Sequence, residues 1–298
     1  MRHDVIVVGG SFAGLSAALY VARARRRVCV IDTGLPRNRF AAHAHGLFAQ
    51  DGSVPGEMLA TARAQVAAYP TASFVQGRAV DAERSDAGFR VRLATGDLLE
   101  AAQLVLAFGI ADGLPEIAGL AERWGRSVLH CPYCHGFEFA GRRLGVLAVS
   151  PMSLHQAELV AEWGPTTLYL DGIALPDPDA LAPLRARGIE IETARVRAVH
   201  GDGTALASIE LEDGRAAAID ALFLAPRTRL NSDIAERLGC AIDAGPFGPL
   251  VRTDEQRATS VPGVFAAGDI TRAAHSVTFA CADGVAAGIS AHRTLVFG

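Results

Sequence analysis

Two cysteines separated by two residues give this sequence its clearest chemistry. Cys131 and Cys134 flank Pro132 and Tyr133, and His135 and Gly136 follow. Such a pair can close a small disulfide ring, in which the first thiol is usually the accessible nucleophile and the second resolves a mixed disulfide. A zinc site would need a second ligand pair at metal spacing, and the remaining cysteines stand singly on apolar runs. The pattern favours a redox dithiol over a structural pair, and we expect no metal.

His135, directly after the second cysteine, is the candidate acid–base group. A neutral imidazole can take a proton from a thiol, whose pKa of about 8.5 leaves it mostly protonated at pH 7. The alternative is that His135 is a polar residue of a surface loop. We expect the catalytic role, so the predicted catalytic residues are Cys131, Cys134 and His135.

A glycine-rich turn near the N-terminus predicts a dinucleotide site. An apolar strand over residues 5–8 precedes the turn, and a helix over 15–24, a strand over 27–31 and Asp32 follow it. In this order the helix amides point at a pyrophosphate, and the acid can accept hydrogen bonds from a ribose. One departure is Ser11, which stands where the middle glycine usually is. The residues expected to bind the nucleotide here are Gly9, Gly10, Ser11, Phe12, Ala13, Gly14 and Asp32.

A second strand that ends in an acid lies near the C-terminus. The apolar run 264–267 leads into Gly268 and Asp269, and a helix is expected from 276 to 291. An acid at this place can bond the ribityl and phosphate region of a flavin. The N-terminus of the helix would stabilise negative charge on a reduced flavin ring.

Taken together, these segments resemble the low-molecular-weight thioredoxin reductase family. The matching pieces are residues 9–14, 104–109, 131–136 and 259–269, which follow the family's order over nearly the whole chain. The resemblance implies an α/β fold with two Rossmann-like, three-layer domains. A discontinuous FAD domain (1–110 and 231–298) would hold an inserted NAD(P)-like domain (111–230) that carries the CxxC motif. It also implies FAD as cofactor, a homodimer, and further flavin contacts at Arg37, Asn38, Gly109, Gly268, Asp269, Ser276 and Val277.

The middle domain lacks the nucleotide-binding features that the family has there. A strand over 144–147 is followed by residues 148–153, Ala-Val-Ser-Pro-Met-Ser, in place of a glycine-rich turn. The side chains of Ala148 and Ser150 would crowd a pyrophosphate, and Pro151 has no amide to donate. The next strand, 166–170, ends at Asp171, without the arginines that grip a 2′-phosphate. A divergent NADH site stays open, but we expect a scaffold for the CxxC motif.

The Cys-Pro-aromatic-Cys-His pattern narrows the resemblance to the dithiol oxidase branch, which closes the disulfides of gliotoxin-like and holomycin-like metabolites. It implies that a substrate thiolate attacks Cys131 and that a second thiol, deprotonated by His135, displaces it. Cys134 would then pass the electrons through FAD to O2, giving H2O2. Two alternatives remain: a thioredoxin reductase that uses NADPH or another donor such as ferredoxin, and a flavin-bound redox sensor.

Three further histidines have no settled role. His43 and His45 lie in a loop that passes near the flavin in the family, where a histidine could line the substrate pocket or simply be solvated. His130 could cap or orient the CxxC turn.

The composition limits the number of domains, the kinds of partner and the cellular compartment that we expect. The chain has 298 residues and a net charge of -4, which suits two domains and offers no basic surface for nucleic acid. No apolar run approaches the roughly 18–20 residues of a membrane span. The first strand begins at residue 4 without a signal-peptide layout, and five cysteines with one CxxC fit a reducing compartment. We therefore expect a cytoplasmic enzyme that acts on a small dithiol and O2, with no nucleic acid or membrane partner.

Overall fold

The chain forms two compact units in a computed structural model that describes residues 2–86, 88–174 and 178–298. The terminal unit comprises Met1–Arg39, Pro55–Ala111 and Thr228–Gly298, and the central unit comprises Phe40–Val54 and Asp112–Arg227. Residues 40–54 thus group with the CxxC segment and not with the sequence around them. Where the chain passes between the units, the strands β7 (Ile110–Gly113) and β16 (Arg227–Leu230) pair with each other.

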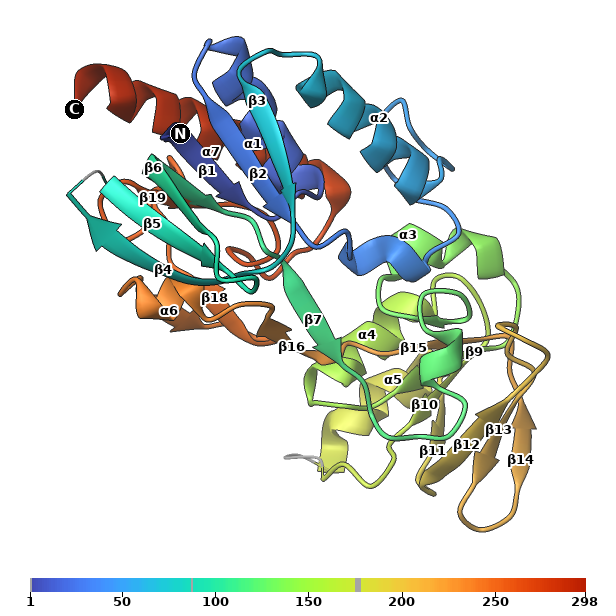
Figure 1. Ribbon diagram of the computed structural model, residues 1–298. Helices are drawn as coiled ribbons and strands as arrows, with labels where there is room; N and C mark the ends of the chain where they lie inside the picture. Colours follow the sequence, from blue (N-terminus) through green and yellow to red (C-terminus); the bar gives the residue numbers. More distant parts are fainter. Residues whose placement is uncertain (1, 87, 175–177) are drawn as a thin grey trace. The chain divides into compact units, whose positions relative to one another are not determined.

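The terminal unit is built on a seven-stranded sheet in the order β3-β2-β1-β6-β5-β4, with β19 also paired to β6 (Figure 1). β1, β2, β3, β6 and β19 pair in parallel, whereas β4 and β5 form an antiparallel ribbon on β6. Strand β6 is long enough to pair with β5 through its first half and with β19 through its second half. The strands are β1 (His3–Val8), β2 (Val28–Asp32), β3 (Ala72–Gln76), β4 (Ala79–Ser85), β5 (Gly88–Leu93), β6 (Leu98–Leu106) and β19 (Val264–Ala266).

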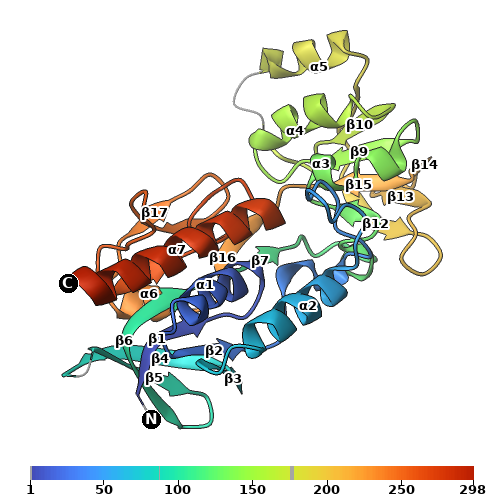
Figure 2. The ribbon, with the colours of Figure 1, turned by 90° about the horizontal axis from the view of Figure 1, so that it is seen from above.

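Alternate residues of β1 face two different cores. Val5 and Val7 pack with the helices α1 (Phe12–Arg23) and α7 (Val277–Phe297), while Ile6 and Val8 pack with β4, β5 and the short helix α6 (Ile234–Arg237). Figures 1 and 2 show α1 between α7 and α2 (Pro55–Ala67). The remaining strands of this unit are β17 (Ile242–Ala244) and β18 (Pro249–Val251), and a 3-10 turn covers Arg37–Phe40.

Close helix packing joins the two ends of the chain. A Cβ at Gly284 of α7 would collide with the carbonyl oxygen of Ala13, and one at Gly288 would lie 2.6 Å from that of Ala17. The two small residues therefore let α7 approach the backbone of α1 directly. This contact brings the loop before α7 to the N-terminus of α1, where the expected flavin residues lie.

The central unit is also a three-layer α/β structure. A five-stranded parallel sheet in the order β11-β10-β9-β15-β8 has one core against helices α4 and α5 and another against the antiparallel sheet β12-β13-β14. Its strands are β8 (Val128–Leu129), β9 (Leu144–Leu147), β10 (Thr166–Tyr169), β11 (Glu190–Glu192), β12 (Val196–His200), β13 (Ser208–Leu211), β14 (Ala216–Ala218) and β15 (Ala221–Phe223). Its helices are α3 (Pro132–His135), α4 (Met152–Val160) and α5 (Ala182–Ala186), with 3-10 turns at Ala121–Arg123, Phe137–Phe139 and Pro178–Leu181.

The predicted α/β class with two Rossmann-like units is confirmed by these two sheets. One difference concerns α7, which was expected to end near 291 and runs to Phe297, because neither glycine nor proline occurs between 291 and Gly298. In the part of the chain that the structure describes, no helix is both long and apolar enough to cross a membrane.

Candidate active site

The CxxC motif forms a disulfide at the start of α3. Cys131 follows β8 after a single residue and is the N-cap of the helix, with Pro132 at the first helical position, where a missing amide costs nothing. Its sulfur is bonded to Cys134, with the two Cα atoms 5.3 Å apart. The backbone amide of Cys134 also donates to Sγ of Cys131 (3.2 Å). The helix start thus presents an oxidised pair whose first sulfur has a hydrogen-bond donor beside it.

Gln156 of helix α4 and Trp163, three residues beyond the end of that helix, hold the CxxC segment in place. Gln156, a buried residue of α4, donates from Nε2 to the carbonyl of His130 (3.0 Å), directly before Cys131. The ring of Trp163 meets Tyr133 edge-on at 5.7 Å. A Cβ at Gly136 would lie 2.7 Å from the Trp163 indole, so the residue after His135 must be small. Sequence reasoning missed Gln156 and Trp163, since neither belongs to a recognisable motif.

His135 is well placed to accept a proton. Burial lowers its pKa below the ordinary value of 6.5; the Glu138 carboxylate opposes this shift and the His45 charge adds to it. The imidazole is therefore neutral at pH 7 and has a free lone pair for a thiol proton. The low pKa also means that the group stays available as a base in mildly acidic solution.

The segment 40–54 brings a second histidine to His135. The His45 ring lies edge-on to that of His135, with centroids 6.2 Å apart. Its Nε2 is 3.4 Å from Oε1 of Glu138, and its Nδ1 is 3.6 Å from Oδ1 of Asp51. His43 lies 6.2 Å further along, with Nδ1 3.0 Å from the carbonyl oxygen of Gly52. Of the three histidines without a settled role, His45 thus lies beside the catalytic candidate.

In the terminal unit, the first turn has the close contacts of a phosphate cradle. Gly9 has φ +110°, and a Cβ there would collide with the carbonyl of Ala107. A Cβ at Gly14 would collide with the carbonyl of Gly9, and one at Gly10 would lie 2.7 Å from the Asp32 side chain. The amide of Gly10 donates to Asp32 (3.1 Å). Because these glycines have no side chain, the turn packs directly against its neighbours, and a pyrophosphate can approach the backbone amides of the turn.

The first amides of α1 remain available to a ligand. Within the described chain, the Ser11 hydroxyl makes no capping hydrogen bond although Ser11 is the N-cap, and Phe12 and Ala13 begin the helix. A helix N-terminus with unsatisfied amides stabilises an anion. The turn residues therefore fit the phosphates of FAD.

The C-terminal residues expected at the flavin lie next to this turn. Gly268 has φ +82°, and a Cβ there would lie 3.0 Å from that of Ala13. Asp269 pairs with Arg37, with Nη1 3.1 Å from Oδ2, and Asn38 follows in the same 3-10 turn. The structure thus brings Arg37, Gly268 and Asp269 to the start of α1.

Two further expected contacts lie at chain turns. Gly109 has φ +69° and accepts a hydrogen bond from the amide of Asn231 (3.1 Å). Ser276 caps α7 by accepting from the amide of Phe279 (3.0 Å), and Val277 is the first residue of that helix.

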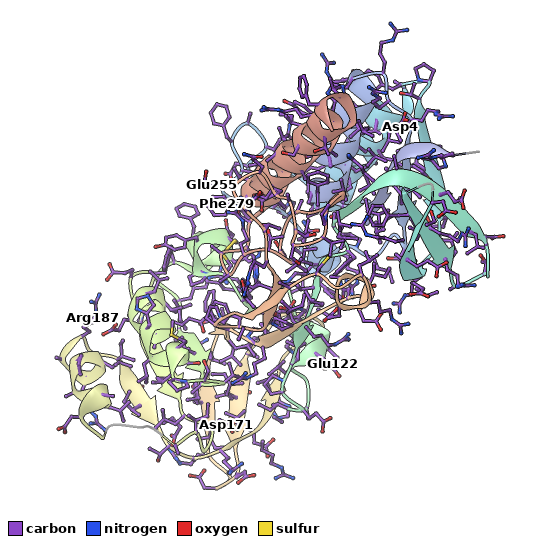
Figure 3. All side chains as sticks on the ribbon, turned by 90° about the vertical axis from the view of Figure 1, so that its left-hand side faces the viewer. Asp4, Glu122, Asp171, Arg187, Glu255 and Phe279 are labelled. Atoms are coloured by element: carbon purple, nitrogen blue, oxygen red, sulfur yellow. A yellow bond between two sulfur atoms is a disulfide. The ribbon has the colours of Figure 1, made fainter. Side chains whose placement is uncertain are left out.

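A buried carboxylate that the sequence did not reveal fixes the loop before α7. Asp283 is 1% exposed and pairs with Arg257 (2.8 Å) and Arg272 (2.6 Å). The Arg272 guanidinium also lies 4.7 Å from the centre of the Phe279 ring, which is labelled in Figure 3. Two arginines on one acid neutralise its charge and hold the loop that carries the flavin candidates.

The corresponding turn of the central unit is closed by the chain's own side chains. The buried hydroxyl of Ser153 in α4 accepts from the amides of Val149 (3.1 Å) and Ser150 (3.4 Å). At the end of β10, Asp171 (Figure 3) accepts the amide of Val196 (2.8 Å) with a φ of +49°. The two groups that would contact a nucleotide's phosphate and ribose are therefore engaged within the protein.

Over residues 2–86, 88–174 and 178–298, no three histidine, cysteine or acidic side chains gather as metal ligands.

The comparisons with known proteins define the class. Residues 3–160 and 178–284 match the family described as pyridine nucleotide-disulphide oxidoreductase, and the chain belongs to that family. It is 34% identical over 278 residues to "Thioredoxin reductase tcpT" of Claviceps purpurea, covering 89% of this chain and 86% of the relative. It is 32% identical to "Thioredoxin reductase sirT" of Leptosphaeria maculans, covering 96% and 92%. A solved oxidoreductase from Agrobacterium tumefaciens is 47% identical with a TM-score of 0.94, covering 100% and 99% of the two chains.

The protein is therefore a flavin-dependent thiol–disulfide oxidoreductase of the thioredoxin reductase type, and FAD is its cofactor. These predictions from the sequence are confirmed. The roles of individual site residues, the substrate and the electron acceptor belong to the proposal below.

Proposed function

We propose that the protein is an FAD-dependent dithiol oxidase that forms a disulfide in a small-molecule dithiol, with O2 as acceptor and H2O2 as product. The observation that carries this proposal is the closed turn between β9 and α4. Because Ser153 occupies the amides of Val149 and Ser150, the central unit offers no cradle for the pyrophosphate of NADPH. In the proposed reaction, the electrons enter from a thiol substrate.

The proposal assigns FAD to the terminal unit. The phosphates would lie against the turn of residues 9–14, and Asp32, Arg37 and Asp269 would hold the ribose and ribityl hydroxyls and the adjacent phosphate. Gly109, Ser276 and Val277 would contact the ring system, and Asn38 the chain beside Arg37. When bound, FAD supplies a two-electron acceptor that O2 can reoxidise. The central unit keeps the role of a scaffold for the disulfide.

The thiol chemistry follows from the CxxC segment. A substrate thiolate attacks Sγ of Cys131, the protein S–S bond breaks, and its electron pair goes to Cys134. His135 takes the proton of the second substrate thiol, and the new thiolate attacks the sulfur bound to Cys131. The substrate leaves as a disulfide, and the protein holds a dithiol that has gained two electrons.

The surroundings of the disulfide favour a small apolar substrate. Tyr133 and Phe137, one helical turn apart around the second cysteine, are 74% and 81% exposed. Exposed aromatic rings beside a reactive sulfur offer a surface for an apolar molecule. The proposal extends to a cytoplasmic homodimer, for which size-exclusion chromatography with light scattering is the direct test of assembly.

A second candidate is a disulfide reductase that takes electrons from NADPH or another donor such as ferredoxin. The names of the two fungal relatives, both called thioredoxin reductases, favour it. Anaerobic titration of the yellow protein with dithiothreitol, NADPH and NADH separates the two functions. Bleaching by dithiol alone, followed by H2O2 release on adding air, supports the oxidase. Rapid stoichiometric bleaching by NADPH would reinstate the reductase.

A further inference from the structure

Glu138 lies one helical turn beyond His135 and has no part in the thiol steps above. Its Oε1 faces Nε2 of His45 at 3.4 Å, and the His45 ring is in edge contact with His135. The carboxylate thus belongs to a cluster of three side chains from two segments of the central unit. These segments are far apart in the sequence, so the cluster is a property of the fold.

A base that becomes positively charged in a partly buried position needs a compensating charge. Among the described residues, the titratable groups that act on His135 are Glu138 on its own segment and His45 on segment 40–54, since the disulfide-bonded cysteines do not titrate. His45 in turn is flanked by Asp51 (3.6 Å) and by the ring of His43. Glu138 is the carboxylate whose charge acts directly on His135.

We propose that Glu138 is a positioning residue for His135, and that its carboxylate, anchored by His45, stabilises the imidazolium formed when His135 takes the substrate's proton. The inference rests on the proposed dithiol oxidation, in which His135 is the base. During the step, the S–H bond breaks, its electron pair stays on sulfur, and an N–H bond forms on His135. Glu138 itself neither gains nor loses a proton.

The two neighbours of His135 act on its pKa in opposite directions. The Glu138 charge raises the pKa of His135, and the His45 charge lowers it. We therefore expect the pKa of His135 to fall further when Glu138 is removed and to rise when His45 is removed. A purely structural role would not produce opposite signs in two variants of one cluster.

The experiment compares Glu138→Gln, Glu138→Asp and His45→Gln with the wild type, each carrying FAD. We expect Glu138→Gln to lower kcat/KM for dithiothreitol by about tenfold, short of the roughly 10²–10⁴-fold loss expected for the base itself. The acid limb of its pH profile should move to lower pH, whereas that of His45→Gln should move to higher pH. Glu138→Asp should recover most of the rate. Glu122→Gln, at an exposed site of the same unit (Figure 3), is the matched control and should be unchanged.

NMR titration of the His135 imidazole in the oxidised proteins provides a readout that needs no turnover, with His135→Ala identifying the signal. Shifts of opposite sign in an enzyme that fails to oxidise dithiols would remove the proposed function and leave the positioning role standing. Shifts of the same sign, or none, in an active oxidase would overturn the role of Glu138.

Discussion

The turn between β1 and α1 and the turn between β9 and α4 occupy the same place in two βαβ units, yet different partners satisfy their amides. In the first turn, glycines bring the backbone close to its neighbours, and the N-cap Ser11 bonds none of the described helix amides. In the second, Ser153 reaches back from the helix to the amides of Val149 and Ser150. The amides of the first turn are open to a phosphate. In the second turn, the Ser153 hydroxyl lies where a phosphate would accept the same hydrogen bonds.

The acids after the following strands differ in the same way. Asp32 ends β2 and accepts a hydrogen bond from the amide of Gly10, inside the turn that we propose binds the flavin nucleotide. Asp171 follows β10 with its backbone in the left-handed region, and its carboxylate accepts from Val196 of β12. Asp32 thus belongs to the proposed binding turn, whereas Asp171 links the end of β10 to β12.

Under the proposed function, the central unit keeps the architecture of a nucleotide fold while its turn and strand-end acid bond to the protein itself. Helix α4, which would carry the phosphate in a working site, holds the carbonyl of His130 through Gln156. The polar side chains of this helix therefore support the redox segment. The family is named for a pyridine nucleotide, and under the proposed function the closed turn is the place where this chain departs from the family.

The largest expected effect concerns the disulfide itself. If the central unit contributes thiol chemistry in place of a nucleotide, Cys131→Ser and Cys134→Ser should each abolish turnover and keep FAD bound. We expect a strong change in the flavin absorption spectrum for Cys134→Ser alone, because the resemblance places that thiol nearer the flavin. Steady-state O2 consumption and spectra of the purified variants test this. Equal spectral changes in both variants would reverse the assignment of the two sulfurs.

The next largest effect on the rate is expected from removing His135, the proposed base. His135→Ala should slow dithiol oxidation by roughly 10²–10⁴-fold, as is usual when a general base is removed. Raising the pH above about 9 should partly restore the rate, since the substrate is then already a thiolate. Rates measured across pH for a thiol substrate check both effects. An unchanged rate would move the search for the base to His43 and His45.

The wild-type pH profile follows from the same residue. Burial lowers the pKa of His135, so the group becomes protonated and inactive only as the pH falls below that depressed value. The acid limb of kcat/KM should therefore lie below pH 6.5. The same shift affects stability, because the unfolded chain binds the proton more readily and is favoured as the pH falls from the ordinary value toward the depressed one. An acid limb above pH 6.5 would contradict this assignment.

A smaller effect is expected from adding a methyl group to the turn between β1 and α1. Gly14→Ala would place a methyl group against the carbonyl of Gly9, where backbone and not a flexible side chain has to move. We expect a loss of about 1–3 kcal/mol of stability together with weakened FAD retention. Gly56→Ala is a suitable control, because a Cβ at this exposed position of α2 meets nothing within 4 Å. FAD content and thermal melting distinguish the two, and full FAD retention in Gly14→Ala would show that the turn tolerates a side chain.

Part of this comparison was accessible from the sequence. Periodicity and glycine spacing predicted the first strand–turn–helix unit within a few residues, and apolar runs predicted the strands over 144–147 and 166–170 of the second. The missing glycines at 148 and 150 and the proline at 151 already indicated a degenerate turn. What periodicity could not give was the partner of each amide. The hydrogen bonds that Ser153 accepts depend on a side-chain rotamer, and the bond from the Val196 amide to Asp171 joins residues that are far apart along the chain.

The same limit applies to the candidate active site. The motif identified Cys131, Cys134 and His135, but Gln156, Trp163 and Glu138 act through contacts that only the folded chain creates. The grouping of residues 40–54 with the central unit is a further example, because the loop leaves the sequence of the terminal unit and returns to it. Its pairing of His45 with Glu138 follows from that path and from no local pattern.

The smallest effect is expected from removing the Ser153 hydroxyl. This change tests whether Ser153 alone closes the turn between β9 and α4. Ser153→Ala removes a buried hydroxyl that accepts two amides of the turn, so stability should fall by about 1–2 kcal/mol, the usual cost of leaving buried amides without an acceptor. FAD content should not change, and NADPH should still fail to bleach the flavin, because Ala148 and Pro151 continue to obstruct a pyrophosphate. His155→Ala, an exposed substitution in the same helix, should leave both melting temperature and spectra as they are. Bleaching of Ser153→Ala by NADPH would mean that a single hydroxyl separates the two turns, and that the central unit has kept the rest of a nucleotide site beneath it.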